Sequence, residues 1–94
     1  MKVTEETYEN QRAYMRQRVP SEESVKKLRE IMLITEHRVI ATLTGISYPG
    51  LSAILYRSQP TITRKSAALI NHLHRQLYRA VRSTERLRET MRKF

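Results

Sequence analysis

A chain of 94 residues is long enough for one small domain with a single core. It contains no cysteine, which excludes disulfides and cysteine-based zinc sites, and no apolar run approaches the roughly 20 residues that span a bilayer. The net charge is +9, and no Asp or Glu occurs between Glu36 and Glu85. We therefore expect a cytoplasmic protein with no membrane contact. Nucleic acid is the partner that this charge favours, and a basic face that only keeps the chain soluble is the alternative.

The first predicted element is a helix over residues 5–17, which Thr4 caps and Pro20 ends. Its apolar residues are sparse, so the helix needs a surface to dock on; they are Tyr8, Ala13, Tyr14 and Met15. Residues 1–20 are thus expected to form an N-terminal arm or helix.

Two further helices are expected before the first glycine. Ser21 is expected to cap one of them, and its apolar residues recur at spacings that give one buried face, namely Val25, Leu28, Ile31 and Met32. Thr35 is expected to cap the next helix, over residues 36–43, whose inward residues would be Val39, Ile40 and Leu43.

The window from His37 to Tyr56 has the residue types that two short, crossing helices need. Ala41 is small where the second helix passes, and Gly45 suits a turn that requires positive φ. Ile46 would plug the core, and Ser47 would cap a helix over residues 48–57. That helix would bury Leu51, Ile54 and Leu55.

The last predicted helix follows a loop over residues 58–62, begins after the cap Thr63 and runs to about residue 92. A stripe of mostly apolar residues, with alternating spacings of three and four, runs along this helix. It is formed by Ile70, Leu73, Leu77, Ala80, Thr84, Leu87, Met91 and Phe94. At about 1.5 Å per residue the helix is roughly 43 Å long, more than a small core can cover. Either a second subunit or the N-terminal helix is expected to cover the far half.

These features resemble the Cro and lambda-repressor-type helix-turn-helix family over about residues 24–76. The matching positions are Ala41, Gly45-Ile46-Ser47, Leu51-Ser52 and Ile54, followed by the segment from Thr63 to Ile70. The family often has Gln where this chain has His37, an acidic residue near Leu55 and glycine near Arg57. The resemblance implies an all-α fold: a compact helix-turn-helix bundle of four to five helices with a long C-terminal helix. Residues 21–76 would be the DNA-binding domain, and residues 77–94 a dimerisation extension.

In such a domain the second helix of the motif enters the major groove. The base-contacting candidates are Tyr48, Pro49, Ser52, Ala53 and Tyr56. The phosphate-contacting candidates are His37, Arg38, Ser47, Arg57, Gln59, Thr61, Thr63, Arg64 and Lys65. The dimerisation candidates are Leu73, Leu77, Ala80, Thr84, Leu87, Met91 and Phe94.

No nucleophile–base pair or phosphate-binding glycine loop is present in the sequence, so we expect no enzyme, and no cofactor or metal is expected. His72 and His74 are two residues apart, which does not suit a helical metal pair, and we expect surface or interface histidines. The expected function is a sequence-specific regulator of transcription, a phage-like repressor that binds paired half-sites of double-stranded DNA as a homodimer. The alternatives are an antitoxin or recombination accessory protein whose C-terminal helix binds another protein, and a non-specific or RNA-binding protein.

Overall fold

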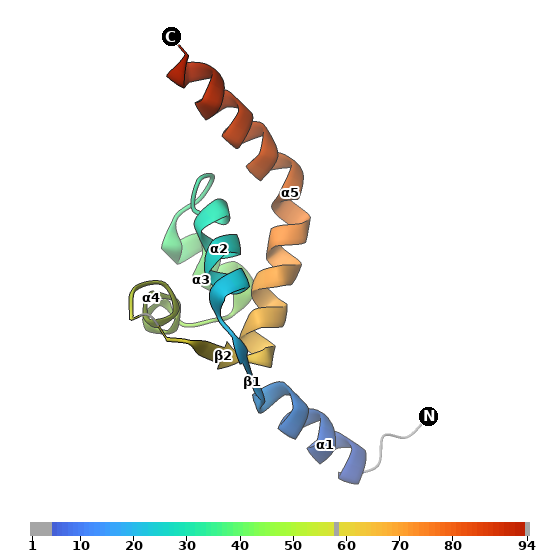
Figure 1. The fold of residues 1–94 in the computed structure, drawn as a ribbon. Helices are drawn as coiled ribbons and strands as arrows, with labels where there is room; N and C mark the ends of the chain where they lie inside the picture. Colours follow the sequence, from blue (N-terminus) through green and yellow to red (C-terminus); the bar gives the residue numbers. More distant parts are fainter. Residues whose placement is uncertain (1–4, 58, 94) are drawn as a thin grey trace.

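The computed structural model describes residues 5–57 and 59–93, with side chains from Asn10 onward, and it is mostly helical (Figure 1). The elements in chain order are α1 (Glu5–Arg16), β1 (Arg18–Pro20), α2 (Glu22–Ile31), α3 (His37–Thr44), α4 (Tyr48–Tyr56), β2 (Thr61–Thr63) and α5 (Arg64–Arg92). The predicted helical class with a long C-terminal helix is confirmed. Within the described residues, the two short strands are the part of the fold that was not predicted.

Strand β1 precedes the segment that contains α2, α3 and α4, strand β2 follows it, and the two strands pair with each other. They are antiparallel, with Val19 opposite Ile62, and both of these side chains pack on the core. Hydrogen bonds extend the pairing at each end: Arg64 N–H donates to the Gln17 carbonyl at 2.8 Å, and Ser21 N–H donates to the Pro60 carbonyl at 3.1 Å. The expectation of a loop over residues 58–62 was therefore wrong for Thr61 and Ile62, which belong to β2. Pro20 lies in β1 instead of ending α1 directly.

The core is formed where α2, α3, α4 and the first half of α5 meet. Leu28, Ile40, Leu51 and Ile70 are fully buried in it. Val25 on α2 and Met32 directly after it are half-buried against this cluster, so the predicted inward face of that helix is confirmed. The other buried members of the cluster are Ile31, Ile54, Leu55, Ile62 and Leu73.

Helix α3 buries a different stripe from the one predicted. Ile40 and Thr44 are buried, whereas Val39 and Leu43 are exposed. Positions 40 and 44 share one face of a helix, and the buried Thr44 hydroxyl donates to the Ile40 carbonyl at 2.7 Å, so burial leaves that hydroxyl paired. The prediction that Val39 and Leu43 point inward was wrong because it followed apolar character alone.

Two of the predicted caps were also wrong. Ser21 precedes α2, but its hydroxyl donates to the Gln59 carbonyl and makes no cap bond. Helix α3 begins after Glu36, not after Thr35, and no side chain caps it. By contrast, Ser47 Oγ accepts from Gly50 N–H at 3.1 Å and Thr63 Oγ1 accepts from Ser66 N–H at 3.2 Å, as predicted.

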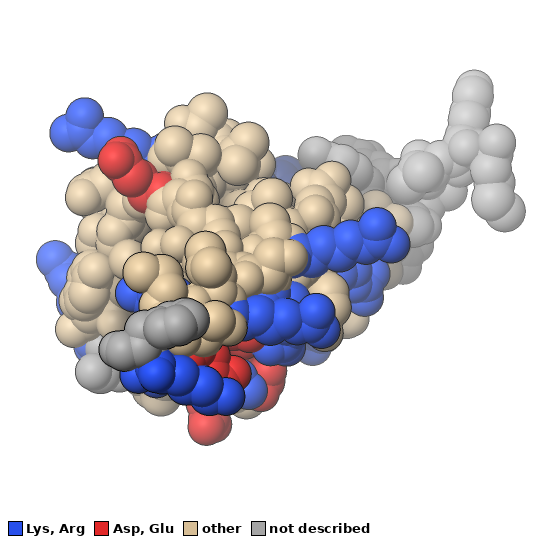
Figure 2. Space-filling view, turned by 90° about the horizontal axis from the view of Figure 1, so that it is seen from above, with Lys and Arg blue, Asp and Glu red and all other residues tan. Residues whose placement is uncertain are grey.

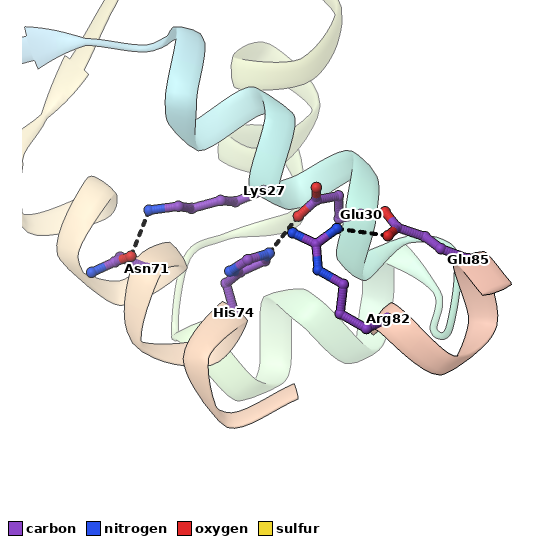
Figure 3. Close-up of polar contacts among 6 residues, drawn as sticks. All are labelled: Lys27, Glu30, Asn71, His74, Arg82 and Glu85. Atoms are coloured by element: carbon purple, nitrogen blue, oxygen red, sulfur yellow. Dashed lines mark hydrogen bonds and ion pairs between the residues drawn. The ribbon is translucent and has the colours of Figure 1, made fainter. Parts of the chain in front are cut away.

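Polar pairs fasten α2 to α5 beside the core (Figure 3). His74 Nε2 lies 2.5 Å from Glu30 Oε2 in a largely buried pair, and Lys27 Nζ donates to Asn71 Oδ1 at 2.6 Å. His74 is thus buried within the chain between α2 and α5, so it is not the surface or interface histidine that was expected, whereas His72 is exposed. These contacts fix the side of α5 that faces α2.

Two helical segments project from this body, which gives the molecule dimensions of 60 × 32 × 21 Å. Helix α1 and the C-terminal half of α5 point away from each other in Figure 1. Helix α1 meets the beginning of α5, where the Arg64 guanidinium lies 4.4 Å from the Tyr14 ring centroid. The alternative that the N-terminal helix folds back over the far half of α5 was therefore wrong.

No single helix of the described residues is long and apolar enough to cross a membrane. Helices α3 and α4 together have sufficient length and apolar composition, but the chain bends by 115° between them.

Candidate nucleic-acid interface

Helices α3 and α4 form a helix-turn-helix arrangement. The 115° bend between them falls within the range usual for that motif. Gly45 sits in the turn at φ +75°, a conformation that glycine adopts without strain, and its N–H donates to the Ala41 carbonyl at 2.9 Å. Ile46 and Ala41 are half-buried against the core, as the sequence predicted. This geometry holds α4 firmly by one face.

The opposite face of α4 is open to solvent. Leu51, Ile54 and Leu55 are buried, whereas Tyr48 is 48% exposed and Tyr56 is 67% exposed. Pro49 is exposed, and Ser52 and Ala53 are half-buried. The five residues predicted to contact bases therefore lie on α4 and all retain some contact with solvent, with the two tyrosines most exposed.

His37 connects the two ends of this face. Its ring centroid lies 5.2 Å from that of Tyr48 and 5.8 Å from that of Tyr56, with tilted planes. The His37 Nε2 atom is buried and has no hydrogen-bond partner among the described residues. Sequence analysis predicted a phosphate contact for His37 but not this aromatic packing, since a contact across a helix crossing gives no local signal.

The predicted phosphate contacts separate into two groups. Arg38, Ser47 and Arg57 are exposed on α3, at the cap of α4 and directly after α4. All three therefore lie on or beside the helix-turn-helix and are accessible to solvent.

The second group lies around β2 and the start of α5, and most of its polar groups are already bonded. The Thr61 hydroxyl accepts from Arg18 Nε at 3.2 Å, Thr63 caps α5, and the Gln59 carbonyl accepts from Ser21. Arg64 is half-buried beside α1, and its Nη2 is 3.5 Å from Gln17 Oε1. Lys65 is exposed. Arg18, which the sequence did not single out, belongs to this group through its bond to Thr61.

The predicted dimerisation stripe on α5 is divided in the same way. Leu73 is buried in the core of the chain itself and Leu77 is half-buried against it, so neither is available to a second subunit in this structure. Thr84 is half-buried, and Ala80, Leu87 and Met91 are exposed. Phe94 lies outside the described residues.

Positive charge is spread widely over the surface. Figure 2 shows Lys and Arg side chains projecting at several places around the body, with fewer acidic side chains in view. Hydrogen bonds to Tyr78 and Glu85 raise the pKa of Arg82. Among the described residues, no group of three or more His, Asp or Glu gathers where it could hold a metal ion.

Comparisons with protein-family models, with curated proteins and with solved structures found no match.

Proposed function

We propose that this chain is a sequence-specific regulator of transcription, acting as a repressor, that inserts α4 into the major groove of double-stranded DNA. The observation that carries the proposal is the geometry of α4, which is buried along Leu51, Ile54 and Leu55 and open along Tyr48 and Tyr56. A helix of this width fits the major groove, and tyrosine offers both a ring and a hydroxyl to base edges.

The charge pattern supports the same proposal. No acidic residue occurs between Glu36 and Glu85, a range that includes α3, α4, β2 and most of α5. Duplex DNA would therefore meet no carboxylate from this range when α4 approaches it. The start of α4 has no Arg, Gln or Asn, so part of the specificity would come from the shape of the duplex. Such a protein would act on the nucleoid in the cytoplasm, as a homodimer on two half-sites.

The experiment that tests this is selection of bound duplexes from a random library at about 0.15 M salt. Two inverted half-sites about one helical turn apart are expected. Tyr48→Ala and Tyr56→Ala should weaken binding to the selected site. Tyr78→Ala is a matched control, because Tyr78 is 47% exposed but lies on α5. Binding without any enriched sequence would contradict the proposal and favour a non-specific or RNA-binding protein.

A second candidate is an antitoxin or recombination accessory protein that binds DNA through α4 and another protein through α5. The observation that favours it is the exposed end of α5, where Leu87 and Met91 meet solvent. Strict dependence of DNA binding on an added protein would support this second candidate.

A further inference from the structure

Two helical segments are exposed along their length in the described part of the chain, although α1 touches the start of α5 where Arg64 lies over the Tyr14 ring. Every residue of α1 from Asn10 onward is exposed, and so is every residue of α5 from Arg86 to Lys93. The last fully buried residue of α5 is Val81. Short helical segments are marginal in water unless they pack against something, so both segments need more packing surface than the same chain supplies.

Each of these segments carries exposed apolar side chains. On α5, Leu87 is 61% exposed and Met91, one turn later, is 65% exposed. On α1, Tyr14 and Met15 are exposed. Burying such side chains against each other is favourable. Within one chain this cannot happen, because α1 packs at the start of α5 and the two segments point apart (Figure 1).

The charge of the C-terminal end of α5 distinguishes between the surfaces that could cover it. Residues 82–93 contain five basic and two acidic residues, whereas residues 5–16 contain three acidic residues, all before residue 10, and two basic ones, Arg12 and Arg16. Two α5 ends side by side would bring like charges together, which is unfavourable. A phosphate backbone would match the arginines but would leave Leu87 and Met91 uncovered. By sequence, residues 5–16 have a net charge of −1 and include the apolar Tyr14 and Met15, so of these three candidates α1 suits both the positive charge and the apolar residues of the α5 end.

We propose that two copies of this chain associate by a reciprocal exchange, in which α1 of each copy covers the last two turns of α5 of the other. A single two-fold axis makes both contacts at once, because the two segments lie at opposite ends of each copy (Figure 1). This inference rests on the proposed function for its biological role, since a regulator of paired half-sites must be a dimer. Helix α4 is not used in the contact and stays open for DNA.

Cysteine cross-linking tests the inference directly, because the chain has no cysteine of its own. Met15→Cys and Met91→Cys are made as two separate full-length proteins, which are mixed and oxidised without DNA. Helix α1 of one copy beside α5 of the other predicts a mixed disulfide between the two proteins. The Met91→Cys protein alone should link to itself at least about tenfold more slowly, since a disulfide needs Cα atoms within roughly 7 Å.

A charge exchange provides the second measurement, with the mass in solution as the readout. Glu9→Arg and Arg88→Glu should each raise the dimer dissociation constant, by about threefold to tenfold, and the double variant should recover most of the loss. Lys26→Glu is the control, because Lys26 is exposed on α2 and outside the contact, and it should leave the dimer unchanged. Leu87→Glu should raise the constant by more than about tenfold.

The outcomes separate the possible occupants. A monomer at about 0.1 mM, or a predominant link between two Met91→Cys chains, would overturn the reciprocal exchange. A dimer that forms only when a duplex is added would overturn it too, in favour of DNA as the cover of α5. Since no DNA is present in the main test, a chain that fails to bind any duplex can still dimerise in this way. A chain that binds its operator as a monomer would overturn this inference and the homodimer of the proposed function, but it would leave sequence-specific binding by α4 standing.

Discussion

A Cβ added at Gly50 would lie 2.9 Å from Ser47 Oγ, the same oxygen that caps α4 by accepting from Gly50 N–H at 3.1 Å. The absence of a side chain at residue 50 therefore leaves room for the cap of its own helix. Close packing against the preceding helix would be another reason for a glycine at this position. The nearest atoms belong instead to Ser47 and, at 3.3 Å, to Ile46 Cγ2.

Gly50→Ala should therefore not give the usual gain in stability. Alanine improves helix propensity by about 1 kcal/mol, but it displaces a cap that is worth about as much. In a Ser47→Ala background the cap is already lost, so Gly50→Ala should stabilise the chain by up to about 1 kcal/mol. Urea unfolding of the four proteins measures this cycle. An equal gain in both backgrounds would show that the cap and residue 50 are not coupled.

Gly45 differs from Gly50 because only its backbone conformation matters. Its φ is +75°, and a Cβ there would meet no atom within 4 Å. Gly45→Ala should cost about 1 kcal/mol of unfolding free energy, and Gly45→Asn less, because asparagine tolerates the left-handed region better. Thermal unfolding of both variants checks the order, and an alanine variant as stable as the asparagine variant would contradict the explanation.

The pair between Glu30 and His74 should be coupled in stability. Each side chain is largely buried, so removing either one leaves the other without its partner. Glu30→Leu and His74→Leu should each cost about 2 kcal/mol, and the double variant should cost less than their sum by about 1 kcal/mol. Chemical denaturation measures the coupling. The exposed pair between Arg82 and Glu85 is the control, and Glu85→Gln should have no measurable effect on stability.

His37 allows packing and DNA contact to be separated. Its Nε2 is buried without a partner among the described residues, so His37→Phe should keep the ring contacts with Tyr48 and Tyr56 at no cost in stability. His37→Ala should destabilise by about 1 kcal/mol. If His37 also reaches a phosphate, His37→Phe will bind DNA more weakly although it is fully folded. If the phenylalanine variant binds DNA with unchanged affinity, His37 makes no phosphate contact and only packs against Tyr48 and Tyr56.

The salt dependence of DNA binding should report the phosphate contacts individually. If six phosphates are neutralised, the slope of log affinity against log salt should be near −5, at about −0.9 for each contact. Arg38→Ala should make the slope less steep by about 1, because Arg38 is an exposed cation on α3, the first helix of the proposed DNA-binding motif. Arg79→Ala on α5 is the control and should leave it unchanged. A slope that changes with Arg79→Ala but not with Arg38→Ala would place the duplex beside α5 and contradict the proposed contact through α3 and α4.

The sequence was informative where a local rule determines the conformation. Gly45 and Ser47 mark the turn and the cap of α4, and the spacing of Leu51, Ile54 and Leu55 gives its buried face. Each depends on neighbours within one helical turn, so composition and spacing suffice to predict it.

Features that depend on distant partners were not predictable in this way. The pairing of Val19 with Ile62 and the bond from Arg18 to Thr61 join segments on either side of three helices. The outward position of Val39 and Leu43 follows from which face of α3 the other helices cover. Both features depend on how the helices pack together in the folded core, so the residues adjacent in sequence do not reveal them.

The small sheet also determines how the molecule should respond to mechanical force. Because β1 and β2 are antiparallel, α1 leaves and α5 begins at the same end of the ribbon, where Arg64 N–H donates to the Gln17 carbonyl. A pull on α1 against α5 would open this ribbon like a zipper, one hydrogen bond at a time. The bond between Ser21 and Pro60, at the far end, would break last. Tension between the two projecting helices would therefore be relieved in the strands before it reached α4.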